Sequence, residues 1–208
     1  MRFNFETKGS RMSDTNSGER ERVRLSKDSW LSHTLTKIGE VGVANIQIEA
    51  LAKELRVTKG SFYWHFKNRD ALLSETLEYW YRSATKAIGL AAQRNFEEPI
   101  DRLRYFFTLA FNRRPDVPGG PIEQALREWA RISEIAEQTT RQVDEDRVSL
   151  IADAYSELGM GEYQARQRAT MALAQITGLN LLSRAMGKRC QTQNAKAFLE
   201  IYLSATAK

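Results

Sequence analysis

Basic, hydroxyl and aromatic side chains are concentrated between residues 47 and 69. Lysine can donate to guanine acceptors, and hydroxyl and amide side chains bind phosphates or base edges. From Lys53 to Arg69 there are five basic residues and one acidic residue, a formal charge of +4. We therefore expect this segment to contact DNA through Gln47, Thr58, Lys59, Gly60, Ser61, Tyr63, Trp64, His65, Lys67 and Arg69.

These side chains are expected to contact different parts of the DNA. Lys59 and Ser61 are predicted to reach base edges, whereas Tyr63, His65, Lys67 and Arg69 are better placed for phosphates. Trp64 has two interpretations: it packs on the sugar backbone or it covers the core of its small domain. A solvated surface is the usual fate of basic helical residues, but aromatic residues interleaved with them favour a contact surface.

Two short helices joined by a turn are expected to hold these side chains. Leu51, Ala52 and Leu55 share one face of the first helix, and Val57 fills the turn. Phe62 and Phe66 give the second helix a buried face, with Thr58 at its N-cap. This pattern is typical of a helix-turn-helix, which places its second helix in a major groove.

Residues 57–72 read Val-Thr-Lys-Gly-Ser-Phe-Tyr-Trp-His-Phe-Lys-Asn-Arg-Asp-Ala-Leu and resemble the recognition segment of the tetracycline-repressor (TetR) family. The resemblance covers about residues 26–80 and departs at Arg56, where the family usually has Gly. A left-handed Arg56 would cost about 1 kcal/mol. This sequence also departs from the family at Gln47, which is a weak N-cap for the first helix of the helix-turn-helix. Either Asn45 caps that helix or its first turn frays.

The resemblance implies a DNA-binding transcriptional regulator. Such a protein would be a repressor that binds a palindromic operator as a homodimer and is released by a small-molecule effector, or inducer, of unidentified chemistry. Two alternatives are a helical ligand-binding or enzymatic domain with a vestigial DNA-binding motif, and a nonspecific DNA organiser. A steep loss of affinity with salt would favour phosphate contact over the vestigial motif.

Helical periodicity recurs along the rest of the chain without any strand pattern, so we expect an all-α fold of about nine helices. We divide the chain into a disordered N-terminal arm (1–24), a helix-turn-helix DNA-binding domain (25–72) and a larger C-terminal helical ligand-binding and dimerisation domain (73–208). Ser26 and Asn68 are expected to cap helices, and Gly42 to end one. The helix after Asn68 carries Leu73, Leu77, Trp80, Ala84, Ile88 and Ala91 on one face.

Two further sets of residues are candidates for sites in the larger domain. The resemblance implies an inducer cavity lined by Trp80, Phe106, Phe107, Phe111, Trp129 and Tyr155, although each by itself suits an ordinary core. A narrow seam at alternating spacing predicts a dimer interface, the alternative being a seam inside one chain. The interface set is Ala169, Ala172, Ile176, Leu179, Ser183, Phe198, Ile201 and Tyr202.

The composition limits the other function classes. The 208 residues carry a net charge of +5, which favours an anionic partner, and the single Cys190 excludes an internal disulfide. No apolar run reaches the length of a membrane span, so a cytoplasmic protein is expected. His33 has no metal-ligand partner at ligand spacing and no nucleophile motif appears, so we expect no metal, no cofactor and no enzyme activity.

Overall fold

The computed structural model describes residues 25–111 and 119–204, with only the backbone described for residues 183–192. The expected arm of residues 1–24 and the side chain of Ser183 lie outside the described residues. Every regular element in the described chain is helical, which confirms the expected all-α fold. The elements are α1 (Lys27–Val41), η1 (Val43–Asn45), α2 (Ile48–Glu54), α3 (Lys59–Tyr63), α4 (Arg69–Tyr81), η2 (Arg82–Lys86), α5 (Ala87–Asn95), α6 (Pro99–Phe111), α7 (Gly120–Ala130), α8 (Glu134–Glu157) and α9 (Glu162–Ser204).

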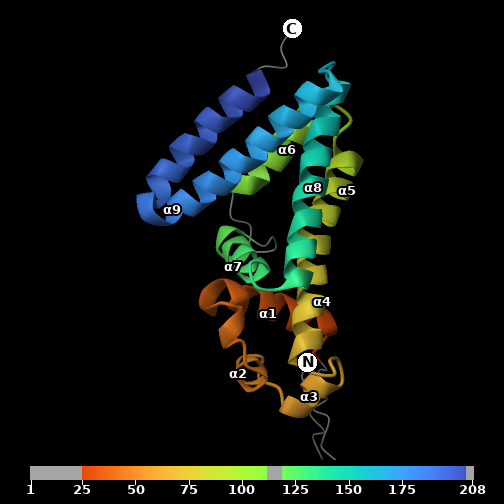
Figure 1. The fold of residues 1–208 in the computed structure, drawn as a ribbon, viewed down its shortest axis with the longest axis vertical. Helices are drawn as coiled ribbons and strands as arrows, with labels where there is room; N and C mark the ends of the chain where they lie inside the picture. Colours follow the sequence, from red (N-terminus) through yellow and green to blue (C-terminus); the bar gives the residue numbers. More distant parts are fainter. Residues whose placement is uncertain (1–24, 112–118, 205–208) are drawn as a thin grey trace, which may run out of the picture.

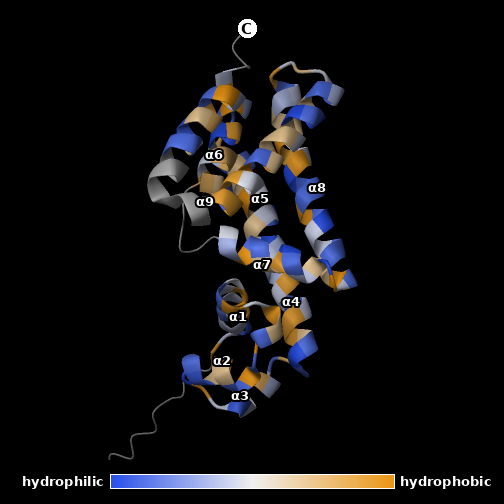
Figure 2. Ribbon diagram, turned by 60° about the vertical axis from the view of Figure 1, so that its left-hand side comes forward, coloured by the Kyte–Doolittle hydropathy of each residue, from blue (hydrophilic) through white to orange (hydrophobic). Residues whose placement is uncertain are grey.

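The helices form an elongated molecule with α2 and α3 at one end and α6, α9 and the upper part of α8 at the other (Figure 1). α4 runs away from the small end and continues through η2 into α5, beside α8 (Figure 1). α7 crosses between the two ends and packs on both α1 and α8. Figure 2 shows hydrophilic residues along much of α8, which leaves only one side of that helix for the core.

Local capping signals set the ends of the first and fourth helices. The Ser26 hydroxyl accepts a hydrogen bond from the backbone N–H of Ser29 at 3.1 Å, and the side-chain Oδ1 of Asn68 accepts from the backbone N–H of Ala71 at 2.8 Å. Gly42 ends α1 with φ 78°, a left-handed value that glycine adopts without strain. These three expectations from the sequence are confirmed.

The second helix begins without a side-chain cap. Gln47 occupies the N-cap position of α2, and its side chain makes no capping hydrogen bond. Asn45 does not replace it, because its Nδ2 donates instead to the carbonyl oxygen of Val41, at 2.7 Å, in the last turn of α1. Thr58 is likewise at the N-cap of α3 without a capping hydrogen bond from its hydroxyl.

The long helix after Asn68 is interrupted by one π-helical segment, η2. Its predicted face is buried as far as Ala84, but Ile88 and Ala91 are only partly buried. Gly89 and Ala92 take their places in the interior. A π turn adds one residue to the helical repeat, so every later side chain moves round the axis by one position. The sequence pattern assumed a uniform helix, which explains the error.

The last helix doubles back on itself. Its hydrogen-bonded backbone is continuous from Glu162 to Ser204, but Figure 1 shows two arms that lie side by side. Arg168 in the first arm donates a hydrogen bond to the carbonyl oxygen of Ile201 in the second, at 2.7 Å. Helical periodicity in the sequence predicts two separate helices here, from Glu162 to about Gly187 and from Thr192 onward, and the two arms correspond to them.

Two hydrophobic cores hold these helices together. The first contains the buried residues of α1 to α4 together with Leu126, Ala136 and Val143 of α7 and α8. The second joins α6, α8 and both arms of α9, where Phe107 meets Phe198 edge to face at 5.0 Å between ring centroids. The first core therefore extends from the small end into the larger helices, while the division at residue 73 stays a prediction.

Candidate DNA-binding interface

A left-handed residue forms the turn between α2 and α3. Arg56 has φ 57°, as expected for the position where the family usually has Gly. The next residue, Val57, donates its backbone N–H to Ala52 O at 2.9 Å, and this hydrogen bond closes the turn. A non-glycine residue in this conformation costs about 1–2 kcal/mol, so the packing around the turn must offset this strain.

The third helix has one fully buried side and one exposed side. Phe62 is 0% exposed and Phe66 is 2% exposed, and Phe62 packs edge to face on Trp30 with 5.6 Å between the ring centroids. Tyr63 and Trp64, between these two residues, are 55% and 77% exposed. Trp64 therefore does not cover the core of the small domain. The surface interpretation of this residue remains.

The remaining predicted contact residues are arranged around the start and the exit of α3. Thr58, Lys59, Gly60 and Lys67 are exposed, and Ser61 is partly buried. A Cβ atom added at Gly60 would have only one neighbour within 4 Å, Thr58 Oγ1 at 3.6 Å. Internal packing thus does not require glycine at this position, whereas close approach of the backbone to a ligand would favour it.

Lys59 is held by an acidic residue of the preceding helix. Its Nζ lies 2.5 Å from Oε1 of Glu49, in the first turn of α2. This hydrogen bond lowers the pKa of Glu49 and raises the pKa of Lys59, so both groups stay charged at neutral pH. The position of Glu49 beside Gln47 at the start of α2 predicts contact with the DNA backbone or with a base donor such as the cytosine amino group. Its pairing with Lys59 could not be predicted, because a ten-residue separation gives no signal until the turn geometry is known.

Two predicted phosphate ligands are used inside the protein instead. The guanidinium of Arg69 donates to Ile46 O at 2.9 Å and to Val43 O at 2.6 Å. His65 Nε2 lies 2.9 Å from the carbonyl oxygen of Leu25, where the ring nitrogen must donate. In the free chain these donors therefore bind backbone carbonyls before α1 and around η1, and phosphate contact by His65 and Arg69 stays a prediction.

A small ionic cluster fastens α2 to α1. His33 Nε2 and Lys37 Nζ lie 2.9 Å and 3.1 Å from the carboxylate oxygens of Glu54. The hydrogen bond from Lys37 lowers the pKa of Glu54. His33, which the sequence left as a surface or core residue, thus helps to brace the helix-turn-helix.

Close packing between α1 and α7 connects the small end of the molecule to the larger helices. A Cβ atom added at Gly39 of α1 would lie 2.7 Å from Cγ1 of Ile122 and 3.1 Å from its backbone nitrogen. No side chain larger than hydrogen fits there without a shift of α7 or α1. A displacement of α7 would consequently act directly on the helix that supports α2 and α3.

A charged network joins α7 to α8 and to the π turn. Arg147 of α8 forms an ion pair with Glu123 of α7 at 2.6 Å and donates to Ala84 O at 3.2 Å within η2. Burial by itself would raise the pKa of Glu123, but the charge and hydrogen bond of Arg147 outweigh burial and lower it. Next to it, Asp146 accepts a hydrogen bond from the Tyr81 hydroxyl at 2.7 Å.

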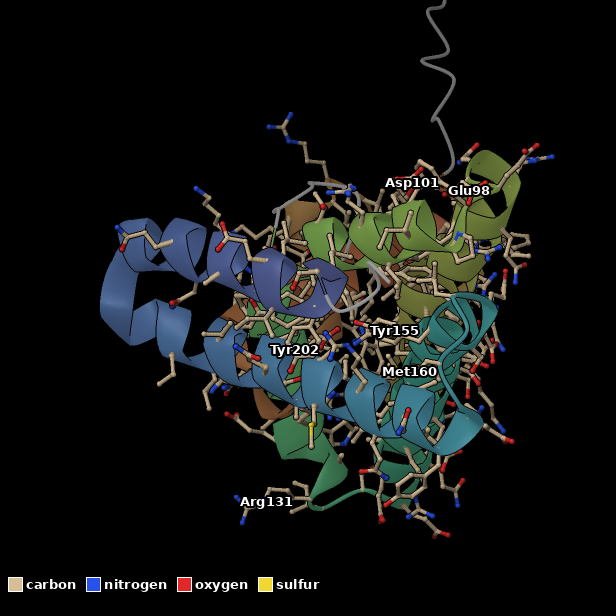
Figure 3. All side chains as sticks on the ribbon, turned by 90° about the horizontal axis from the view of Figure 1, so that it is seen from above. Glu98, Asp101, Arg131, Tyr155, Met160 and Tyr202 are labelled. Carbon is tan, nitrogen blue, oxygen red and sulfur yellow. The ribbon has the colours of Figure 1, made fainter. Side chains whose placement is uncertain are left out.

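The predicted cavity residues do not form one group. Trp80 is buried in the first core with Trp129 packed against it, whereas Phe106, Phe107, Phe111 and Tyr155 belong to the second core. Tyr155 donates its hydroxyl hydrogen to Tyr202 O at 2.8 Å, so its polar end is satisfied between α8 and α9 (Figure 3). The six rings are thus divided between two cores, and their grouping in one cavity stays a prediction, since single-residue aromaticity carries no information on which core a ring joins.

The predicted dimer seam lies inside one chain. Ala169, Ala172 and Phe198 are 0% exposed, and Ile176 and Tyr202 are also buried in the second core, with Leu179 partly buried. This burial matches the alternative of a seam inside one chain, because small residues at alternating spacing suit the close packing of α9 on its own neighbours; their role in a dimer stays a prediction. Ile201 alone of the described set is strongly exposed.

A different face of α9 is both apolar and exposed. Met171, Leu181 and Leu182 are exposed in the first arm, and Ile201 is exposed in the second. Gly178 lies between them at helical spacing, and a Cβ atom added to it would meet nothing within 4 Å. Large exposed apolar residues in this arrangement mark a surface that another protein chain can cover.

Two kinds of site are absent from the described residues, 25–111 and 119–204. No group of three or more His, Cys, Asp or Glu side chains in them is arranged to hold a metal ion. None of their helices combines the length and the apolar character needed to cross a membrane.

The comparisons with known proteins agree with this geometry. Residues 31–76 match the sequence model described as bacterial regulatory proteins, tetR family. A 60-residue segment is 33% identical to tetracycline repressor protein class G of Vibrio anguillarum, covering 29% of this chain and 29% of that protein. A 74-residue segment is 28% identical to the HTH-type transcriptional regulator YerO of Bacillus subtilis (strain 168), covering 36% and 24%. The chain thus spans less than a third of either relative in these matches.

The likeness in fold extends much further along the chain. A TetR transcriptional regulator from Legionella pneumophila superposes with a TM-score of 0.72 at 13% identity, covering 90% of this chain and 100% of that one. Escherichia coli NemR in its reduced form gives a TM-score of 0.69 at 20% identity, covering 85% and 96%.

Proposed function

We propose that this TetR-family transcriptional regulator is a repressor that binds a palindromic operator as a homodimer and is released by a small molecule. One observation carries the DNA-binding part: α3 and the turn after it bury Phe62 and Phe66 and expose Lys59, Tyr63 and Trp64 at one end of the molecule. A major groove accepts such a helix, and the exposed Lys67 would then meet phosphates. The protein would act in the cytoplasm, where its DNA is.

A second copy of the chain is the partner we propose for the exposed face of α9. Met171, Gly178, Leu182 and Ile201 supply an apolar surface on two adjacent arms, and two such surfaces would make a four-helix contact across a two-fold axis. Two recognition helices could then enter successive major grooves, which are roughly 34–36 Å apart.

Release by a small molecule would act through the contacts around α7. A ligand that moves α7 or α8 must also move Gly39, which touches Ile122, or break the pair of Arg147 with Glu123. Either change would tilt the small domain and spoil the spacing of the two recognition helices. The ligand needs only to prefer the state that does not fit the operator.

Selection from random duplex DNA tests this proposal. The purified protein is incubated with the pool at about physiological salt, where phosphate attraction alone gives little retention. Enrichment of a palindrome is the expected result. Enrichment of a single unrepeated site would contradict the dimer, and no enrichment would favour the vestigial motif or the nonspecific organiser.

The proposed contact face of α9 has its own test. Leu182→Glu places a charge in the apolar surface and is expected to shift the protein from dimer to monomer in analytical ultracentrifugation. Glu200→Gln is the control, because Glu200 is exposed beside Ile201 and its change adds no charge. A Leu182→Glu variant that stays dimeric at low micromolar concentration would place the interface elsewhere.

A further inference from the structure

We infer that Glu49 and Lys59 together read one G·C base pair in each half of the operator, Lys59 on the guanine and Glu49 on the cytosine. The inference rests on the proposed function and adds to it a specificity-determining residue, Glu49, and the base pair that it recognises. It starts from the contact between Nζ of Lys59 and Oε1 of Glu49, which lie 2.5 Å apart.

The two side chains are placed to enter a groove together. Lys59 is the first residue of α3, and Glu49 lies in the first turn of α2. Both side chains remain about half exposed or more, at 51% and 65%, although they bind each other. A base pair can therefore approach their outer sides without any repacking of the core.

The major-groove edge of a G·C pair has the matching pattern of groups. Guanine presents two acceptors in succession, N7 and O6, and cytosine N4 presents a donor beside them. An ammonium group can donate to both guanine acceptors while the neighbouring carboxylate accepts from N4. Adenine offers its single acceptor N7 next to the donor N6, and thymine presents the acceptor O4 where cytosine has its N4 donor. An A·T pair therefore places a donor against the ammonium and an acceptor against the carboxylate.

The charge balance of the pair favours specificity over general affinity. A lone lysine at this position would bind any phosphate or base acceptor, whereas the carboxylate of Glu49 repels both. Because the pair has no net charge, it should add little to the salt dependence of binding, which depends on the number of phosphates neutralised. Lys67, which is exposed at the exit of α3, has no such constraint from Glu49.

The test compares base preferences rather than overall binding. The operator obtained by selection with the unchanged protein is altered one base pair at a time, and fluorescence anisotropy gives the affinity of each duplex for the unchanged protein, Glu49→Ala, Lys59→Ala and Glu40→Gln. Glu40 is the matched control, because it also pairs with a lysine, Lys37, at 2.7 Å, but on α1.

Glu49→Ala and Lys59→Ala should each lose about tenfold discrimination at the same G·C pair in each half-site. Other positions should keep their preferences, and Glu40→Gln should keep all of them. Glu49→Gln should broaden the preference at that pair towards A·T, because an amide can both donate to and accept from adenine.

Two results would overturn the inference while leaving the proposed function intact. In the first, Glu49→Ala strengthens binding to every duplex equally, which would make Glu49 a simple restraint on Lys59. In the second, the two variants lose discrimination at different base pairs. If the unchanged protein enriches no sequence at all, the proposed function fails first and this inference fails with it.

Discussion

Replacing Gly39 by Ala tests how tightly α1 and α7 are joined. The new Cβ would lie 2.7 Å from Cγ1 of Ile122 and 3.1 Å and 3.2 Å from its backbone nitrogen and Cα. The side-chain atom can rotate away, but the two backbone contacts require a shift of a helix. Overpacking of this kind costs about 1–3 kcal/mol, and the better helix propensity of Ala returns about 0.5–1 kcal/mol. We expect a net loss of about 1 kcal/mol in the free energy of unfolding.

Urea unfolding followed by circular dichroism measures this difference, at one fixed protein concentration because a dimer would make stability depend on it. Gly60→Ala is the matched control: it lies in a helix, and its new Cβ would have only one neighbour, at 3.6 Å. It should be neutral or slightly stabilising. In an Ile122→Ala background the cost of Gly39→Ala should fall, since the nearest atom is gone.

The packing argument is refuted if Gly39→Ala stabilises the protein as much as Gly60→Ala does. It is equally refuted if the cost of Gly39→Ala is the same with and without the Ile122 side chain. In either case the close approach of α1 to α7 would not restrict the position of the helix-turn-helix, and the route proposed for the ligand signal would lose its basis.

Four further substitutions test the charged side chains. Arg147→Met leaves the Glu123 carboxylate partly buried without its partner and should lower the free energy of unfolding by about 3 kcal/mol in urea; a loss below about 1 kcal/mol would show that the pair contributes little. Arg69→Gln removes two hydrogen bonds to backbone carbonyls, so it should cost about 1–3 kcal/mol of stability without changing the salt slope of DNA binding. Lys67→Ala should leave the free energy of unfolding unchanged and flatten the salt slope of DNA binding by about one unit. The same flattening for Arg69→Gln would show that Arg69 contacts a phosphate. Burial tends to raise the pKa of Asp146, but its hydrogen bonds outweigh burial and lower it below the ordinary 3.8. Its contribution to stability is therefore present above about pH 4 and lost as the pH falls through the lowered value, so Asp146→Asn should flatten the acid side of the stability profile in thermal melts, and an unchanged profile would contradict this.

The local features of the helix-turn-helix could be predicted because they depend on neighbours in the sequence. The caps at Ser26 and Asn68 and the stop at Gly42 each follow from one residue and its immediate context, whereas the left-handed Arg56 is expected only from the resemblance to a family that usually has Gly at this position. The buried side of α3 could be predicted in the same way, because Phe62 lies four residues before Phe66.

The intramolecular partners that could not be predicted from the sequence lie on distant segments of the chain. Arg69 and His65 have the residue types of phosphate ligands, and only the fold brings Val43, Ile46 and Leu25 to their donors. The alternating small residues of α9 have the same pattern whether they meet a partner chain or their own. Periodicity identifies the apolar face of a helix, but it carries no information on which neighbouring element or chain covers that face.

The π turn at η2 has a consequence for transferring residue roles from relatives. A relative whose helix is uninterrupted at this place has one residue fewer between the same two ends. An alignment of the two sequences without a gap would match every position from Ala87 onward in α5 to a neighbour about 100° away around the helix. A ligand contact known in such a relative would then be assigned to an outward-facing residue here, so a one-residue gap within Arg82–Lys86 is required before any role is carried across.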